Sequence, residues 1–410
     1  MWLGFLHTSF GANFDSAARS TNEFGLDLYR KISAGEGNVC LSPYSISCAL
    51  AMTLAGADGE TRTEMARVLH VDLSSEIDPS FAALQKSLEE MAAKTAKIAQ
   101  DSKKSSGPSE PITIAIADRL FGQIDYEFRP RFLAQVKTNY GAALEPLNFK
   151  QNAAGAIKRI NDWVAKQTRD RIRDLIPAGG LNGAMRLVLA NAIYLKAPWD
   201  DEFYQGATKP EPFYVRGEGA ADVPTMLKHK QLRYAKNDGF TAVAVPYSGG
   251  DLQFVILLPD KIDGLRAMEN KLTASALSDW AKMKESDVVL HLPKFKFGPP
   301  TVALSKPLQA LGMKTAFNIP RGSANFDRMA PRKPDDYLAI SEVFHKTFIA
   351  VDEKGTEAAA ATAVVMLGVR SADFNRPEPI EVKVDRPFLY AVQHVPSGAC
   401  LFIGRVTDPR

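Results

Sequence analysis

Apolar positions in the first half of the chain recur mainly at the spacing of helices. Residues 22–32 follow a helical period, and residues 81–98 and 153–166 do the same. We expect a buried helix to begin at Pro43, because Ser42 can cap its free N–H groups and the residues that follow are apolar on most sides. The first half of the chain is therefore predicted to contain several helices.

Strand-like runs follow in the first half and become frequent in the second half. Residues 112–116 form an apolar strand, and residues 187–195 are a nearly continuous apolar run, typical of a strand buried on both faces. From Val243 onward short strands are frequent, and no regular βα alternation or internal repeat is visible. Residues 100–111 are polar and contain Gly and Pro, which predicts a loop. The pattern predicts an α+β fold with no boundary between separate domains.

Composition narrows the class of protein without indicating a function. Of 410 residues, 45% are hydrophobic and 24% are charged, and the formal net charge is only +3, so binding to nucleic acid or to a membrane is not expected. No apolar run approaches the roughly 20 residues that span a bilayer. Cys40, Cys48 and Cys400 are odd in number and lack CxxC spacing, so we expect buried thiols rather than disulfides.

Familiar catalytic and metal-binding patterns are missing from the sequence. It contains no G-x-S-x-G elbow, no H-E-x-x-H helix and no Walker loop, and its six histidines have no metal-ligand spacing. His345 lies in an apolar, strand-like context, which favours a hydrogen-bonded core histidine. We therefore expect a protein that is not an enzyme and that has no cofactor or metal.

Two basic segments have ordinary explanations. Arg169, Arg171 and Arg173 alternate with aspartates, which is typical of a solvated helix end. A second set forms a modest stripe, for which a plain surface is favoured over a glycosaminoglycan site. Its members are Lys86, Lys94, Lys97, Lys103 and Lys104.

One long segment, between Glu353 and Pro387, fits no ordinary element. Strand-like runs flank it, and a connection of this length inside a compact fold is usually functional or disordered. Residues 356–367 contain no Gly or Pro and become steadily more apolar, which is unlike a linker. An alanine-rich helix is one interpretation. In a strand, by contrast, small residues would share one face and Glu357 would lie on the other.

Such a segment can be exposed as a loop and later enter a sheet. The small residues at its leading end would pass between existing strands without a clash. A dozen new ladder hydrogen bonds at about 1 kcal/mol each would supply on the order of 10 kcal/mol. That energy is comparable to the stability of a whole domain and is enough to drive a large rearrangement.

The sequence GTEAAAAT at residues 355–362 closely resembles the hinge of inhibitory serpins. Further matching motifs follow in the same order and at similar spacing: NVCLSPYSISCALAM (38–52), NAIYLKAPW (191–199), LPKFKF (292–297), SANFDRMA (323–330), ISEVFHKTFIAVDEKG (340–355), RPFLY (386–390) and FIGRVTDP (402–409). The resemblance covers residues 22–409. It implies one serpin domain over residues 1–410, with three β-sheets, eight or nine helices and an exposed reactive-centre loop at 353–386.

The resemblance also implies suicide inhibition of a serine or cysteine endopeptidase. A protease cleaves the loop, the hinge inserts into the central sheet of this metastable protein, and the acylated protease is carried to the far pole and distorted before it deacylates. The hinge residues implied by the resemblance are Glu353, Gly355, Thr356, Glu357, Ala358, Ala359, Ala360, Ala361 and Thr362.

Further roles follow from the same motifs. The shutter is the network whose hydrogen bonds hold the central strands together, and it is matched by Ser42, Ser45, Asn191 and His345. The breach is the place where insertion begins, and it is matched by Trp199. Glu353 is expected to pair with Lys294, as in similar proteins.

Two adjacent bonds are candidates for cleavage. Counting along the family pattern from Glu353 places the bond between Val369 and Arg370, and a small aliphatic residue at Val369 suits an elastase-like pocket. Cleavage between Arg370 and Ser371 would instead suit a trypsin-like protease. We favour Val369 slightly. The segment formed by residues 371–385 is longer than in many relatives, so the way in which the loop presents the bond to a protease stays open.

The alternative is a non-inhibitory serpin that acts as a carrier or chaperone. Such members often have charged, bulky or proline residues in the hinge, whereas Thr356 and the four alanines after Glu357 are small. We expect a monomer whose partner is a chymotrypsin-like serine endopeptidase, with no nucleic acid, membrane or cofactor. The family favours secretion, but residues 1–6 lack a cationic segment and predict no signal peptide, so a cytoplasmic location stays open.

Overall fold

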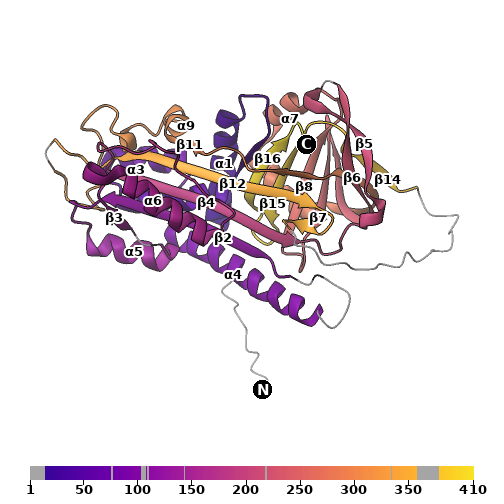
Figure 1. The fold of residues 1–410 in the computed structure, drawn as a ribbon, viewed down its shortest axis with the longest axis horizontal. Coiled ribbons are helices and arrows are strands. Elements are labelled where there is room, and N and C mark those ends of the chain that lie inside the picture. The colour runs from indigo at the N-terminus through magenta and orange to yellow at the C-terminus, as the bar shows by residue number, and fades with distance from the viewer. Residues whose placement is uncertain are drawn as a thin grey trace, which may run out of the picture.

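The computed structural model describes residues 14–74, 77–102, 108, 110–142, 144–217, 219–333, 335–357 and 378–410 (Figure 1). Nine α-helices lie in these ranges: α1 (Asp15–Ile32), α2 (Pro43–Gly56), α3 (Gly59–Val68), α4 (Ile77–Ser102), α5 (Pro130–Tyr140), α6 (Phe149–Gln167), α7 (Leu265–Lys271), α8 (Ala274–Asp279) and α9 (Ser305–Ala310). The strands in the same ranges are β1 (Val39–Leu41), β2 (Thr113–Gln123), β3 (Glu145–Leu147), β4 (Leu187–Pro198), β5 (Lys209–Tyr214), β6 (Ala220–Asn237), β7 (Phe240–Pro246), β8 (Leu252–Pro259), β9 (Lys284–Pro293), β10 (Phe295–Phe297), β11 (Val302–Ala303), β12 (Ile340–Asp352), β13 (Gly355–Thr356), β14 (Ile380–Lys383), β15 (Phe388–His394) and β16 (Ala399–Val406).

Hydrogen bonds connect these strands into a nine-stranded sheet and a seven-stranded sheet. The seven-stranded sheet has the order β10-β12-β13-β4-β2-β3, with β11 added beside β12. The larger sheet is continuous through the long strand β6, whose first residues pair with β5 and whose last residues pair with β7. Dividing it at β6 gives the three sheets that the sequence predicted, and the α+β class is confirmed.

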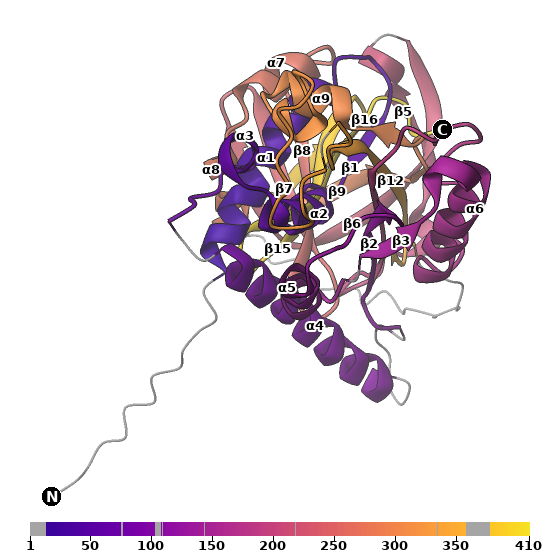
Figure 2. The ribbon, with the colours of Figure 1, turned by 90° about the vertical axis from the view of Figure 1, so that its left-hand side faces the viewer.

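The seven-stranded sheet is covered on both faces. Helix α6 packs on its outer face, where Ile160 and Trp163 join a core cluster with Phe121 and Val188 of the sheet. Helix α2 lies on the inner face, between the two sheets, and is buried on nearly all sides (Figure 2). Because both faces are covered, β4 is buried along almost its whole length, which explains its continuous apolar sequence.

Several elements are longer than their apolar patterns indicate. Helix α1 begins at Asp15, because small and polar residues such as Ala17 and Ser20 are buried there without an apolar period. Helix α4 reaches Ser102, so the predicted loop at 100–111 starts later. Strand β2 continues to Gln123, past the polar residues that end the apolar run at 116.

Two local predictions agree with the structure. The Ser42 side chain accepts a hydrogen bond from the Ser45 N–H, and Pro43 occupies the first turn of α2. Cys40, Cys48 and Cys400 are free thiols, and burial of Cys40 and Cys400 is nearly complete. In the described ranges no helix is both long and apolar enough to cross a membrane.

Candidate functional site

Strands β4 and β12 form a parallel pair that opens at one end. The register runs from Ile340 opposite Leu187 to Phe348 opposite Tyr194. Beyond that point the short strand β13 lies between the two strands, and Thr356 pairs antiparallel with both. We call the place where β4 and β12 separate around β13 the fork.

Aromatic side chains line the fork on its inner side. Trp199 is fully buried and stacks on Tyr247, with ring centroids 4.6 Å apart. The Trp199 Nε1–H donates to the Asp352 carbonyl at 2.9 Å, and the Tyr247 hydroxyl lies 2.5 Å from Thr356 Oγ1. These contacts fix the first residues of the hinge between β4 and β12, and Thr356 is only 1% exposed.

Gly355 lies in the narrowest part of the fork. Its φ is +153°, and a Cβ atom built there would lie 2.2 Å from the Ala197 carbonyl oxygen of β4. No side chain fits at that distance without moving the backbone of β4. The glycine of the hinge motif therefore allows the chain to turn from β12 into the gap.

The expected ion pair at the base of the hinge is present. Lys294 Nζ lies 2.7 Å from Glu353 Oε2, and the Thr208 hydroxyl donates to Glu353 Oε1 at 2.8 Å. Burial works in the opposite direction, but the hydrogen bonds from Lys294 and Thr208 hold the pKa of Glu353 below its usual value. The pair links the turn after β12 to the connection between strands β9 and β10, where Lys294 lies.

Five polar residues meet where β4 and β12 are still closed. We call them the shutter network, and they are Ser42, Ser45, Asp118, Asn191 and His345. Asn191 of β4 is the register partner of both Asp118 in β2 and His345 in β12. All are fully buried except Asp118, which retains partial exposure. The network therefore spans three neighbouring strands and the start of α2.

A chain of hydrogen bonds connects Ser42 to Asp118 through His345 and Asn191. The Ser42 N–H donates to His345 Nε2 at 3.2 Å, so Nδ1 carries the ring proton and donates to Asn191 Oδ1. The Asn191 amide group donates to Ser45 Oγ at 2.6 Å and also to Asp118 Oδ1. The Ser45 hydroxyl donates to the same Asp118 oxygen at 3.0 Å. Such chains polarise their members and strengthen each bond.

The charge states in the network follow from its enclosure. Burial lowers the pKa of His345 from 6.5 to about 3, so the ring is neutral at physiological pH. Burial raises the pKa of Asp118 well above its usual value, although the donors Ser45 and Asn191 oppose this. In the described part of the chain no Lys or Arg is hydrogen-bonded to these residues, so no counter-charge stabilises the Asp118 carboxylate.

The structure brings together the predicted residues in two groups. The group at the fork contains Trp199, Lys294, Glu353, Gly355, Thr356 and Glu357, and the group in the closed part of the β4–β12 pair contains Ser42, Ser45, Asn191 and His345. The remaining predicted site residues lie outside the described residues: Ala358, Ala359, Ala360, Ala361, Thr362, Val369, Arg370 and Ser371.

Sequence reasoning missed Asp118 and Tyr247. An acidic residue inside the apolar context ITIAIADRLFG is a signal that something must satisfy it, and it was available from the sequence. Tyr247 carries no such signal, because its partner Thr356 is far away in the chain.

The two basic segments differ from each other in the structure. Arg173 pairs with Asp170 in solvent, as expected of a helix end, but Arg171 instead reaches the hinge residue Glu357. Lys86 pairs with Glu90 and Lys94 with Asp251, which fits a plain surface. Lys103 and Lys104 lie outside the described residues.

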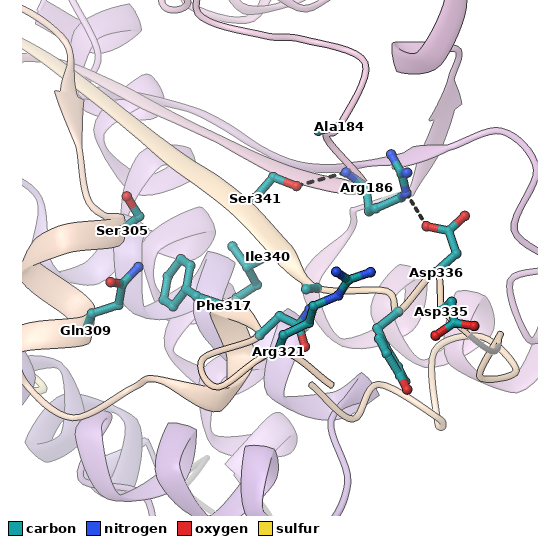
Figure 3. Close-up of a pocket in the computed structure, with 13 residues that line it drawn as sticks. Ala184, Arg186, Ser305, Gln309, Phe317, Arg321, Asp335, Asp336, Ile340 and Ser341 are labelled. Atoms are coloured by element: carbon teal, nitrogen blue, oxygen red, sulfur yellow. Dashed lines mark hydrogen bonds and ion pairs between the residues drawn. The ribbon is translucent and has the colours of Figure 1, made fainter. Parts of the chain in front are cut away.

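A polar cavity of about 470 Å³ opens at the other end of the β4–β12 pair, near Ile340 (Figure 3). Arg186 crosses one side, where its Nε–H donates to Asp336 at 2.5 Å and its backbone N–H donates to Ser341 Oγ at 2.8 Å. The Ser305 hydroxyl donates to Glu342, whose carboxylate also accepts from the backbone N–H groups of Ser305 and Val343. These contacts anchor the start of α9 to β12. Among the described residues no cluster of His, Cys, Asp and Glu has metal-binding geometry.

Comparison with known proteins assigns the chain to a family. The model of the family described as serpin (serine protease inhibitor) matches residues 19–409. Leukocyte elastase inhibitor from Sus scrofa is 35% identical over 406 residues, which cover 96% of this chain and 100% of that protein. Serpin B4 from Homo sapiens is 34% identical over 404 residues, with the same shares covered.

A solved structure leads to the same assignment. Serpin48, described as a highly specific serpin in the insect Tenebrio molitor, superposes with a TM-score of 0.77 at 26% identity, covering 99% of this chain and 100% of that one. The chain belongs to the serpins, a family of serine protease inhibitors and not of enzymes.

Proposed function

We propose that this protein inhibits serine endopeptidases, with cysteine endopeptidases as a second target class, by trapping them as covalent acyl complexes. The protease would cleave the loop after β13, and the hinge would then continue into the gap between β4 and β12. The observation that carries the proposal is the position of Gly355 and Thr356, which already lie between these two strands. The small residues that follow them in the sequence suit the same path.

The geometry of the pair supports a favourable insertion. A strand that enters antiparallel to both β4 and β12 would replace one parallel ladder by two antiparallel ladders. Antiparallel pairing is slightly more stable per residue, and each additional hydrogen bond contributes about 1 kcal/mol net. The closed pair is therefore a metastable arrangement that the loop can convert to a more stable one.

We propose an elastase-like protease as the target, cleaving between Val369 and Arg370. The relatives named leukocyte elastase inhibitor support this choice, as does the aliphatic side chain of Val369. A trypsin-like protease cleaving between Arg370 and Ser371 is the second candidate, because a cationic side chain precedes that bond. The inhibitor is proposed to act as a monomer.

The test is incubation of the purified protein with pancreatic elastase and, separately, with trypsin, followed by denaturing gels. We expect an SDS-stable adduct with elastase and a released C-terminal peptide that begins at Arg370. An SDS-stable adduct with trypsin, together with a released peptide that begins at Ser371, would replace the elastase-like target class with a trypsin-like one. Elastase whose catalytic serine is chemically blocked is the control and should form no adduct.

Cleavage by both proteases without any adduct would contradict the proposed inhibition. Thermal unfolding of the cleaved protein then identifies the step that fails. A large rise in Tm would mean that the loop inserts without trapping the protease, whereas an unchanged Tm would mean that the loop does not insert.

A further inference from the structure

Glu357 is the last described residue of the hinge, and it lies at the fork. Its N–H donates to the Ala350 carbonyl of β12 at 2.8 Å, so it continues the pairing of β13 by one residue. Its φ is +45°, a left-handed conformation that is unfavourable for a residue with a side chain. The carboxylate is nevertheless drawn inward, because the Glu357 side chain is only 11% exposed. Something must compensate for both costs.

The compensation comes from Arg171. Its Nε lies 2.5 Å from Glu357 Oε1. Burial, and after it the charge of the Glu357 carboxylate, raise the pKa of the Tyr194 hydroxyl to about 12. Tyr194 belongs to the last closed pair of β4 and β12, opposite Phe348. Arg171 therefore pairs with the hinge at the point where the two strands begin to separate.

The segment that carries Arg171 is held firmly against the sheet. It connects α6 to β4, and the neighbouring residues Ile172 and Leu175 are buried in the cluster beneath α6. Lys346 of β12 donates from Nζ to the carbonyls of Arg173 at 2.9 Å and Asp174 at 3.3 Å. Arg171 thus extends from a segment that is bound to β12 itself.

We propose that Arg171 is a positioning residue that holds the hinge in the fork, at the depth where insertion must start. The inference rests on the proposed function, because hinge insertion is the step that traps a protease. Arg171 stabilises Glu357 in its strained, enclosed position and keeps β13 between β4 and β12. Without this pair the carboxylate would return to water, and β13 would leave the sheet.

The pair also bears on the competition that decides inhibition. After cleavage, insertion competes with deacylation of the protease. A hinge that is already seated needs no search for the gap, whereas a withdrawn hinge must first re-enter it. Arg171 therefore favours trapping over release.

Hydrogen–deuterium exchange of the free protein tests the proposal without any protease. In the Arg171→Ala variant we expect the amides of residues 351–357 to exchange roughly tenfold faster, while amides in the closed part of β12 are unchanged. Arg173→Ala is the matched control, since the Arg173 side chain pairs with the exposed Asp170 in the same segment, and it should leave exchange at 351–357 unchanged. Arg171→Lys, which keeps the charge but not the planar donor, should give an intermediate rate.

A double-mutant cycle separates the pair from a general loosening of the loop. Glu357→Ala and Arg171→Ala should each accelerate exchange, and the double variant should exchange no faster than the more affected single variant. Additive effects, or unchanged exchange in Arg171→Ala with an unchanged Tm, would overturn the proposal. If Arg171→Ala does not fold, Arg171→Gln replaces it in the cycle.

The functional consequence is measured as the number of inhibitor molecules consumed per protease molecule trapped. We expect Arg171→Ala to raise this number about threefold or more and Arg173→Ala to leave it at the wild-type value. An unchanged number together with faster exchange would also overturn the positioning role. If the wild-type protein traps no protease, the proposed function fails, and the exchange experiment still decides whether Arg171 holds the hinge.

Discussion

The fork and the shutter network stabilise the same pair of strands by different means. At the fork, stacked aromatic rings and short hydrogen bonds hold the hinge in place, and half-exposed cations from neighbouring segments pair with Glu353 and Glu357. The shutter network has no cation, and its hydrogen bonds run through Asn191 from β12 to β2.

This difference indicates how the sheet can be both closed and ready to open. Contacts at the fork can be kept as the hinge advances, because they join Glu353, Thr356 and Glu357 to residues outside the gap between β4 and β12. The Asn191–His345 contact crosses the gap and must break before a strand can pass between β4 and β12. The fork therefore determines where insertion starts, and the shutter network determines how strongly the rest of the pair resists it.

The largest expected effect comes from blocking the fork with a charge. Thr356→Arg would place a guanidinium beside Tyr247 in a position that is 1% exposed, and an unpaired buried charge is costly. We expect at least a tenfold loss of SDS-stable adduct with elastase, with cleavage retained. Thr356→Ser keeps the hydroxyl and should inhibit normally. An equal yield of adduct from the Arg variant would show that inhibition does not depend on the seating of Thr356 at the fork.

Breaking the shutter network should mainly reduce stability. Asn191→Ala removes the only residue that contacts both Asp118 and His345 among the hydrogen bonds described here, so Asp118 keeps only the Ser45 hydroxyl of these donors and the Nδ1–H of His345 loses its acceptor. We expect the free energy of unfolding in urea to fall by about 3 kcal/mol. Asn161→Ala also removes two hydrogen bonds, but beneath α6, and should cost less, about 1–2 kcal/mol. Equal losses would mean that the network is no more coupled than an ordinary pair of hydrogen bonds.

The Asp118 carboxyl should make the network sensitive to rising pH. Because its pKa is raised in the folded protein, its contribution to stability is complete below the usual value of 3.8 and is lost as pH rises through the folded-state value. Asp118→Asn keeps the acceptor oxygen without the charge. We expect this variant to be more stable than wild type by about 1 kcal/mol at pH 8, and equal to it near pH 3.

His345 gives the opposite dependence and serves as the internal reference for this experiment. Its pKa is lowered to about 3, so its contribution is present above 6.5 and is lost as pH falls toward 3. Urea unfolding from pH 3 to pH 8 should show a loss of unfolding free energy at acid pH in both wild type and Asp118→Asn. The loss of unfolding free energy at higher pH should be seen in wild type and be absent in Asp118→Asn. A pH profile identical to wild type would mean that Asp118 is ionised in the folded state at no cost.

The smallest effect is expected at the exposed side of the fork. Lys294→Ala removes the partner of Glu353, but Lys294 is partly solvated and the Thr208 hydroxyl remains. We expect a loss of about 0.5–1 kcal/mol in the free energy of unfolding. Lys296→Ala, two residues away, is the control and should change it by less. A loss as large as that of Asn191→Ala would remove the contrast between the two regions.

The fork and the shutter network were not equally predictable from sequence. The hinge could be identified because residues 355–362 closely resemble the hinge of inhibitory serpins, and Trp199, Asn191 and His345 lie in apolar runs with recognisable motifs. The ion pair of Arg171 with Glu357 could not, because it joins residues far apart in the chain, and alternation of arginine with aspartate indicates only a solvated surface.

The register of the strands explains why Asp118 was missed. Asp118 joins the network because it lies opposite Asn191, and a single sequence does not specify how two strands are aligned. The same limitation applies to Tyr247, whose role depends on a chain segment that returns to it from β12.

The length of β12 has a consequence for the loop itself. Thr356 lies opposite Val351, and β12 begins at Ile340. If the same alignment continued to the first residue of the strand, Leu367 would lie opposite Ile340, with only Gly368 before the favoured bond at Val369. The length of β12 thus matches the number of residues between the hinge and the favoured cleavage bond after Val369. One residue more or fewer in that distance would turn every later side chain to the other face of the sheet.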